Sequence, residues 1–229
     1  MRRLHPDPVG AVTVEEAYAD PSRAPHDGRP WVYMCMISSA DGATSVDGRS
    51  GQLGGAGDHA VFATLRQNAD VVLVGASTAR AERYGPPKRK DLQIAIVTRS
   101  LDIDWSSDLM RSGQALIVTT EDAGPVPDDI SVIRVGRSDV DLAAALRLLH
   151  DRGARVVMAE GGPSLNGQLV TGGLVDELAL TLAPALVAGR SARVAHANLA
   201  VLTEMSLVHV LEEDGSLFLR YRAQASGSR

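Results

Sequence analysis

The stretch that decides the fold is Val156-Val157-Met158-Ala159-Glu160-Gly161-Gly162-Pro163-Ser164-Leu165. Its apolar first half predicts a buried strand, and the two glycines predict a tight turn. Pro163 suits the first position of a helix, because its fixed φ is already helical and an N–H is not needed there. The free N–H groups at such a helix start bind phosphate well, although the same pattern also fits an ordinary strand-to-helix connection.

Short apolar runs recur along the chain and are nearly continuous and β-branched, as in strands that are covered on both faces. They are Trp31–Ile37, Val71–Val74, Gln93–Val97, Ala115–Val118, Val132–Val135, Arg155–Ala159 and Leu178–Leu182. Amphipathic stretches predict helices at Asp58–Asn68 and Asp139–His150, the latter capped by Ser138 or Asp139. Further helices are expected to begin at Ser77 and Pro163. This alternation predicts an α/β fold with a mostly parallel central sheet flanked by helices.

The C-terminal part of the chain follows a different pattern. Met205–Glu212 and Ser216–Tyr221 alternate apolar and polar residues around an Asp-Gly pair, which predicts an antiparallel hairpin. We therefore expect three parts: an irregular N-terminal arm at residues 1–29, with one helical turn near Val14–Tyr18, one domain at residues 30–223, and a disordered tail at residues 224–229.

Composition excludes several classes of function. Hydrophobic residues make up 45% and charged residues 22% of the 229 residues, as in ordinary globular proteins. The aromatic fraction of 3% is too low for stacking platforms that bind single-stranded nucleic acid, and the net charge of −5 gives no general attraction to a polyanion. No apolar run approaches the ~20 residues of a membrane span. We expect neither a nucleic-acid nor a membrane partner.

Cys35 is the single cysteine, so neither an internal disulfide nor a Cys-rich metal site is possible. A buried, inert thiol is the favoured interpretation over a nucleophile, because Cys35 lies in an apolar run. The N-terminal residues lack the apolar core of a signal peptide. We predict a cytoplasmic location and no metal.

Three predicted strands end in residues that suit a phosphate-bearing ligand. Besides Glu160–Leu165, these residues are Gly75-Ala76-Ser77-Thr78 and Thr98-Arg99-Ser100. A guanidinium pairs with phosphate through two parallel hydrogen bonds, so Arg99 suits an adenosine 2′-phosphate. The alternatives are that Ser77 or Thr78 merely caps a helix and that Thr98–Ser100 is a solvated loop. Because parallel strand ends meet at one edge of a sheet, the combination predicts a dinucleotide. The Rossmann fingerprint and the P-loop motif are both absent.

The segment Ser38–Asp58 contains six glycines and predicts a loop that folds over a ligand. Asp58, at its end, suits either a helix cap or a carboxylate that binds the polar edge of a flat heterocycle.

Taken together, four segments resemble the reductase domain of bacterial riboflavin biosynthesis, a family with a dihydrofolate reductase-like fold. They are Ser39-Ala40-Asp41-Gly42, Leu65-Arg66, Val74-Gly75-Ala76-Ser77-Thr78 and Glu160-Gly161-Gly162-Pro163-Ser164-Leu165. The resemblance covers about residues 30–223 and is closest to a stand-alone actinobacterial-type subgroup. It implies an NADPH-dependent reductase that converts the ribose of 5-amino-6-(5-phosphoribosylamino)uracil to the ribityl form, and a homodimer.

The resemblance also implies the site residues. Ser50, Arg66 and Glu160 match substrate-binding positions, with Arg66 suited to a phosphate and Glu160 to a polyol or ring N–H groups; Asp58 joins them as a substrate residue. The expected cofactor contacts are Ile37, Gln52, Gly75, Thr78, Glu82, Thr98, Arg99, Ser100, Gly161, Gly162, Pro163, Ser164 and Leu165. No residue stands out as the proton donor.

The sequence departs from the family pattern near the substrate. Cys35 stands where the family often has a lysine, and Glu82-Arg83-Tyr84 replaces an Asp-Pro. Gln52 replaces a tryptophan, and Arg89 is a candidate for the arginine that holds substrate phosphate. Two alternatives therefore stay open: a dihydrofolate or pterin reductase, in which Asp58 binds the ring, and an NADPH-binding module without catalysis.

Overall fold

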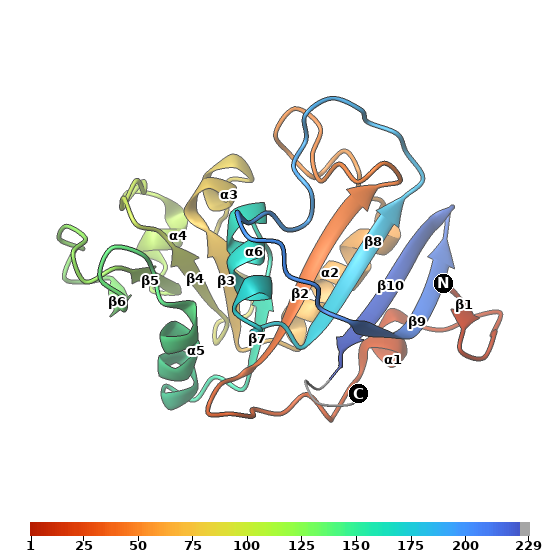
Figure 1. Cartoon of the computed structure of the whole chain (residues 1–229), viewed down its shortest axis with the longest axis horizontal. Coiled ribbons are helices and arrows are strands. Elements are labelled where there is room, and N and C mark those ends of the chain that lie inside the picture. Colours follow the sequence, from red (N-terminus) through yellow and green to blue (C-terminus); the bar gives the residue numbers. More distant parts are fainter. Residues whose placement is uncertain (225–229) are drawn as a thin grey trace.

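The computed structural model describes residues 1–224, and their strands form a single sheet in the order β1-β9-β10-β8-β2-β7-β3-β4-β5-β6 (Figure 1). The strands are β1 (Arg2–His5), β2 (Trp31–Ser39), β3 (Val71–Gly75), β4 (Gln93–Val97), β5 (Ala115–Thr119), β6 (Ser131–Arg134), β7 (Val156–Ala159), β8 (Glu177–Ala183), β9 (Met205–Glu213) and β10 (Ser216–Ala223). From β8 to β6 all neighbours are parallel, whereas β8, β10, β9 and β1 pair antiparallel. The predicted fold class is confirmed.

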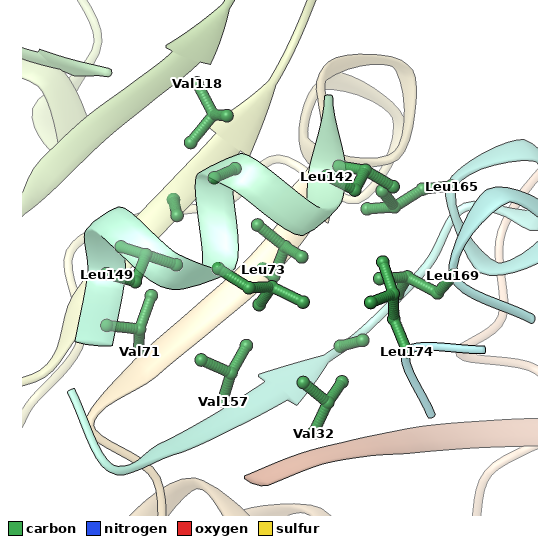
Figure 2. Close-up of a cluster of buried hydrophobic side chains, with 14 of the residues drawn as sticks. Val32, Val71, Leu73, Val118, Leu142, Leu149, Val157, Leu165, Leu169 and Leu174 are labelled. Carbon is green, nitrogen blue, oxygen red and sulfur yellow. The ribbon is translucent and has the colours of Figure 1, made fainter. Parts of the chain in front are cut away.

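Helices cover both faces of this sheet. They are α1 (Val14–Tyr18), α2 (Ala56–Gln67), α3 (Ala76–Ala81), α4 (Asp108–Arg111), α5 (Leu142–Asp151) and α6 (Pro163–Thr171). Successive strand residues point to opposite faces, so Leu73 packs with α5 and α6, and Val72 packs with α2. Figure 2 shows the first of these two cores, where Leu142, Leu149, Leu165 and Leu169 from the helices meet the strand side chains.

Several element boundaries differ from the prediction, mostly by one or two residues; helix α3, for example, begins at Ala76 and not at Ser77. Helix α5 begins at Leu142 because the Asp141 side chain, and not Ser138 or Asp139, accepts a hydrogen bond from Ala144 N. Helix α2 begins two residues before Asp58, so Asp58 lies in its first turn and is not the N-cap. Strand β6 begins one residue earlier than its apolar run, and the four-residue helix α4 was not predicted.

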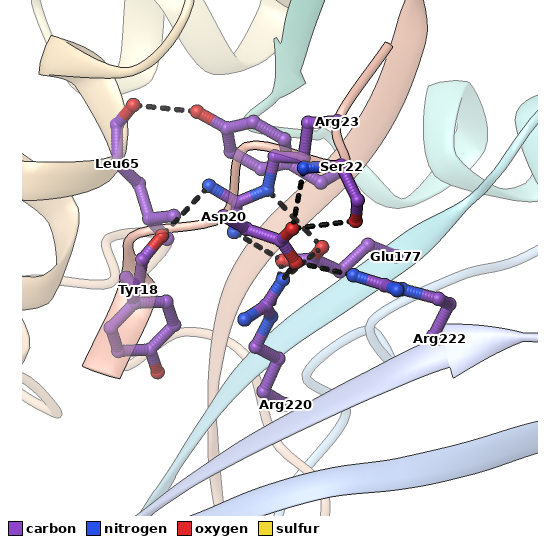
Figure 3. A network of polar contacts seen from close by, with 9 residues as sticks. Tyr18, Asp20, Ser22, Arg23, Leu65, Glu177, Arg220 and Arg222 are labelled. Atoms are coloured by element: carbon purple, nitrogen blue, oxygen red, sulfur yellow. Dashed lines mark hydrogen bonds and ion pairs between the residues drawn. The ribbon is translucent and has the colours of Figure 1, made fainter. Parts of the chain in front are cut away.

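The N-terminal arm is more ordered than predicted. The helical turn at Val14–Tyr18 is present as α1, but Arg2–His5 also pair with β9 as β1. At the start of β8, Glu177 receives hydrogen bonds from Arg23 of the arm and from Arg220 of β10 (Figure 3). Burial alone would raise the pKa of Glu177, but these bonds and charges outweigh it and lower the pKa. The arm is therefore fixed to the sheet by a buried ion network.

The predicted tail at residues 224–229 lies outside the described residues except for Gln224. Within residues 1–224 the helices are all too short or too polar to cross a bilayer, and no group of His, Cys, Asp and Glu side chains in that range has the arrangement of a metal site.

Candidate active site

A cavity of about 730 Å³ opens where β3 and β4 end and α6 begins, and we call it the strand-end cavity. Its lining residues are Gly75, Ala76, Ser77, Arg80, Val97, Thr98, Arg99, Ser100, Asp139, Val140, Gly162, Pro163, Ser164, Leu165, Gln168, Thr171, His196, Ala197, Asn198 and Leu199. In open α/β sheets, ligands bind just beyond the carboxyl ends of parallel strands. The strand-end cavity lies at this position, so it is the expected binding site.

The Gly161-Gly162 turn forms one end of the cavity. Gly75 N donates a 2.7 Å hydrogen bond to Gly161 O, which joins the ends of β3 and β7. Gly161 has a φ of 90°, which favours glycine. A Cβ on Gly162 would lie 2.5 Å from Thr78 Oγ1, so a side chain there has no room. The turn thereby delivers Pro163 to the first position of α6, with the free N–H groups of that helix at the cavity wall.

The cavity lining also carries charge. Arg80 pairs with Asp102 at 3.1 Å, and Arg99 pairs with Asp139 at 2.8 Å. The hydroxyls of Ser77, Ser100 and Ser164 add polar groups along the wall. Together with the start of α6, these cations and hydroxyls form a donor set that suits a phosphate-bearing ligand.

Arg66 of α2 and Glu160, directly after β7, form a buried ion pair. Arg66 Nε and Nη2 donate to the two Glu160 carboxylate oxygens at 2.7 and 2.6 Å, and the Tyr84 hydroxyl donates to Glu160 Oε2 at 2.5 Å. The guanidinium also lies 4.4 Å from the ring centroid of Phe62 and 5.3 Å from that of Tyr84. The Glu160 side chain is 2% exposed and that of Arg66 is 25% exposed. Of the pair, Arg66 is the more open to a ligand.

Burial and charge shift the acidity of this cluster. Burial raises the pKa of the Tyr84 hydroxyl, and the Glu160 carboxylate raises it further. Burial alone would lower the pKa of Arg66, but the hydrogen bond and charge of Glu160 raise it instead. Tyr84 therefore stays a hydrogen-bond donor and Arg66 stays charged at neutral pH.

Cys35 and Asp58 lie near this pair. Burial raises the pKa of the Cys35 thiol, and the negative charges of Glu160 and Asp58 raise it further, so Cys35 is a neutral thiol. Burial also raises the pKa of Asp58, against the opposing effect of its hydrogen bond with the Thr181 side chain.

The Ser39–Gly42 motif holds the loop after β2 in place. Ser39 donates to Asp41 Oδ1 at 2.5 Å, and Asp41 accepts hydrogen bonds from the backbone N–H groups of Val187 and Ala188. The Ser39 bond and these N–H groups lower the pKa of Asp41 to about 2. The segment at residues 184–204 then runs over α6, where His196 N donates to Pro163 O, and it lines the cavity with His196 and Leu199 (Figure 1).

The structure brings most of the predicted cofactor residues together. Eight of them line the strand-end cavity: Gly75, Thr98, Arg99, Ser100, Gly162, Pro163, Ser164 and Leu165. Gly161 and Thr78 are not in the lining: Gly161 bonds to Gly75 within the turn, and Thr78 packs against Gly162. Ile37 packs instead with Leu53 and Ala183, and Gln52 is exposed in a turn away from the lining.

Several residues predicted to contact a ligand form hydrogen bonds within the protein. Glu82 accepts hydrogen bonds from Ser50 N and Ser50 Oγ at 2.8 and 3.0 Å, so these residues tie the glycine-rich loop to the end of α3. Arg89 donates to the carbonyls of Gln67, the last residue of α2, and of Ala69 just after it, and pairs with Asp91, so its guanidinium is held at the end of that helix.

Sequence reasoning assigned no ligand role to Tyr84, Asp139, His196 and Leu199. The signal for Tyr84 was weak, since its contact with Glu160 spans 76 residues of sequence. Asp139 was interpreted as a helix cap, and that role belongs to Asp141.

Comparison with known proteins yields consistent matches. The family model described as the RibD C-terminal domain matches residues 30–217. The 2,5-diamino-6-ribosylamino-4(3H)-pyrimidinone 5′-phosphate reductase of Methanothermobacter thermautotrophicus is 28% identical over 72% of this chain and 82% of its own length. The crystal structure of a pyrimidine reductase-like protein from Corynebacterium diphtheriae has a TM-score of 0.81 and 27% identity, over 94% of this chain and all of the other.

A dihydrofolate reductase from Enterococcus faecalis shares the fold, with a TM-score of 0.51 and 10% identity over 85% of this chain and 96% of that one. The resemblance to riboflavin-biosynthesis reductases, stated from the motifs, is thereby confirmed together with the dihydrofolate reductase-like fold.

Proposed function

Since the chain belongs to the RibD C-terminal domain family, we propose that it is an NADPH-dependent reductase of a pyrimidine precursor of riboflavin. The observation that carries this proposal is the placement of Glu160 and Gly162 two residues apart. Glu160 belongs to the buried Arg66 cluster, and Gly162 lies on the wall of the strand-end cavity. One ligand in the cavity and another beside the cluster would meet at this turn.

The chemistry of the cavity fits a dinucleotide. Its volume of about 730 Å³ lies within the usual range for ligand pockets. The N–H groups at the start of α6 would hold the pyrophosphate, and Arg99 with Ser100 would hold an adenosine 2′-phosphate. When bound, NADPH supplies the hydride that reduces C1′ of the ring-opened ribosyl group.

The residues beside the turn hold the substrate. Arg66 is kept charged and oriented by Glu160, with Phe62 and Tyr84 against its faces, so it donates to substrate oxygen atoms without rearranging. Glu160 is thus a positioning residue for Arg66. Asp58 completes the proposed substrate side, with Ser50, whose Oγ still has lone pairs to accept a hydrogen bond while it donates to Glu82, and Cys35 contributes a neutral surface.

Two substrates differ at position 2 of the pyrimidine ring, which carries an amino group in the compound named for the M. thermautotrophicus relative and an oxo group in the uracil compound. The test is a kinetic comparison of both compounds with NADPH, following loss of NADPH absorbance and gain of two hydrogens in the product by mass spectrometry. Turnover of either one supports the proposal. Tight NADPH binding without turnover of either compound would favour the module without catalysis.

A second candidate function is reduction of a dihydropterin. The half-buried Asp58 carboxyl at the start of α2 favours it, because a carboxyl that is partly shielded from water binds the N–H groups of a flat ring well. Asp58→Asn would abolish binding of a diaminopyrimidine inhibitor and leave the NADPH Kd unchanged. Inhibitor binding that survives the substitution would reject this function.

We also propose a cytoplasmic homodimer, on the resemblance to the family. Gel filtration with light scattering tests the dimer: elution as a monomer at micromolar concentration would reject it.

A further inference from the structure

Asp139 lies between β6 and α5, where the helix does not need it. The N-cap role belongs to Asp141, whose carboxylate accepts the hydrogen bond from Ala144 N. Asp139 instead lines the strand-end cavity, and Asp139 Oδ1 accepts a 2.8 Å hydrogen bond from Arg99 Nη1. Its side chain is therefore part of the ligand cavity and not part of the helix start.

The backbone holds Asp139 in this position. Gly136 has a φ of 74°, and a Cβ added there would lie 2.1 Å from the carbonyl oxygen of Asp139. Only glycine permits so close an approach with this φ. Asp141 N also donates to Val135 O at 3.3 Å, which closes the turn. The carboxylate is thus delivered to Arg99 by a fixed turn.

The charge of the cavity makes this carboxylate distinctive. Among the described residues that line it, Asp139 is the single acid, against Arg80, Arg99 and His196. Arg80 is paired outside the cavity with Asp102. Arg99 is the cation assigned above to the 2′-phosphate of the cofactor. Asp139 is therefore already paired with the guanidinium that this phosphate would bind.

We propose that Asp139 sets the discrimination between NADPH and NADH, an inference that rests on the proposed function. With a 2′-phosphate present, the Asp139 carboxylate competes for Arg99 and repels the phosphate. With a 2′-hydroxyl present, the same carboxylate accepts its hydrogen bond, as acidic residues do in NAD sites. Asp139 therefore lowers the preference for NADPH that Arg99 alone would give.

The size of the expected change in affinity depends on how far the Arg99 and Asp139 side chains are exposed to solvent. The Arg99 and Asp139 side chains are 69% and 75% exposed, so water and salt weaken their interaction. We expect Asp139→Asn to tighten NADPH about threefold to tenfold at low salt, with a smaller gain at high salt. Asp139→Ala, which also lacks an acceptor, weakens NADH about threefold.

The test is calorimetric titration of the full chain with NADPH, NADH, 2′,5′-ADP and ADP. Asp108→Asn is the matched control, because Asp108 forms a 2.8 Å exposed ion pair with Arg111 in α4, outside the cavity lining. It changes the net charge equally. The expected result is tighter binding of NADPH and 2′,5′-ADP in Asp139→Asn alone, with ADP unchanged.

Equal affinities of Asp139→Asn, Asp108→Asn and wild type for 2′,5′-ADP would overturn the inference, as would an equal gain for ADP. Arg99→Ala separates this failure from that of the proposed function. If Arg99→Ala removes the preference for NADPH while Asp139→Asn changes nothing, the cofactor assignment stands and Asp139 has no role. If Arg99→Ala changes no preference, the 2′-phosphate assignment and the role of Asp139 both fall.

Discussion

Arg66 and Glu160 lie 94 residues apart in sequence and join through two hydrogen bonds of 2.7 and 2.6 Å at the end of β7. Because Glu160 is almost fully buried, the carboxylate orients the guanidinium and does not itself face solvent. The segment Glu160-Gly161-Gly162 after β7 thus has two structural roles: its carboxylate fixes Arg66, and Gly162 lines the strand-end cavity.

Tyr84 is the third member of this cluster and gives the first prediction. Tyr84→Phe removes one hydrogen bond to Glu160 and keeps the ring against Arg66, so we expect a stability loss of about 1 kcal/mol. Turnover of the pyrimidine substrate should fall about tenfold as Arg66 loses its fixed position, about 1.4 kcal/mol of barrier. The NADPH Kd, measured in parallel, should not change; a weakened NADPH Kd with normal turnover would contradict this role.

Gly162 and Thr78 provide a paired test of the turn. Gly162→Ala places a Cβ 2.5 Å from Thr78 Oγ1, and we expect the displaced turn to weaken NADPH at least tenfold, or about 1.4 kcal/mol. The double variant with Thr78→Ala removes the clashing oxygen and should recover most of the affinity. Titration of both variants with NADPH measures this, and a double variant that binds no better than Gly162→Ala would reject the steric explanation.

A substitution of Arg89 distinguishes a role in capping α2 from a role in binding substrate. Its guanidinium donates to the carbonyls of Gln67, which ends α2, and of Ala69 just after it, so Arg89→Ala should lower the free energy of unfolding by about 1–3 kcal/mol. The KM for the phosphorylated substrate should stay within twofold of the wild type. Denaturant unfolding and steady-state kinetics check both values. A KM raised tenfold in a protein of normal stability would return Arg89 to the substrate side.

His209 predicts a pH dependence of stability. The side chain lies in β9, edge-on to Tyr18, and burial lowers its pKa to about 4, with the positive charge of Arg220 adding to the effect. An unfolded histidine has a pKa of about 6.5, so the unfolded state binds the proton first. The stability that comes from the neutral ring is complete above pH ~6.5 and is lost as the pH falls toward about 4, by about 3 kcal/mol in total.

His209→Phe is the matched variant for this effect, because phenylalanine keeps the aromatic contact with Tyr18 and cannot titrate. Urea unfolding from pH 7 to 5 should show a steep loss of stability in the wild type and a shallow one in the variant. Parallel curves for the two proteins would contradict the assignment to His209.

The sheet was predictable because its strands are covered on both faces. Gln93–Val97 forms β4 with the bounds of its apolar run, and the hairpin follows its alternating pattern. Strand β1 was not predictable, since three of the four residues Arg2–His5 are polar and their partner β9 lies more than two hundred residues further on. Helix α4 is one turn long and leaves no periodic signal.

The site was predictable where it is local in sequence. Gly162–Leu165 and Thr98–Ser100 follow their strands directly, and they line the cavity as the motifs indicate. Contacts between distant residues were not predictable: Glu160 is held by Arg66 and Tyr84, and Ser50 is bonded to Glu82. Such pairs consume hydrogen-bonding groups that a sequence presents as free, so only the folded chain reveals which residues remain for a ligand.

We propose above that hydride passes from NADPH to the ribosyl carbon at the Gly161-Gly162 turn. The most direct measurement uses NADPH deuterated at the nicotinamide C4 with each of the two pyrimidine substrates, and locates the label by NMR of the product. We expect deuterium at C1′ of a ribityl product, and we expect the Arg66→Ala variant to lose this incorporation. A product that carries no deuterium at C1′, or unchanged incorporation in Arg66→Ala, would contradict this proposal.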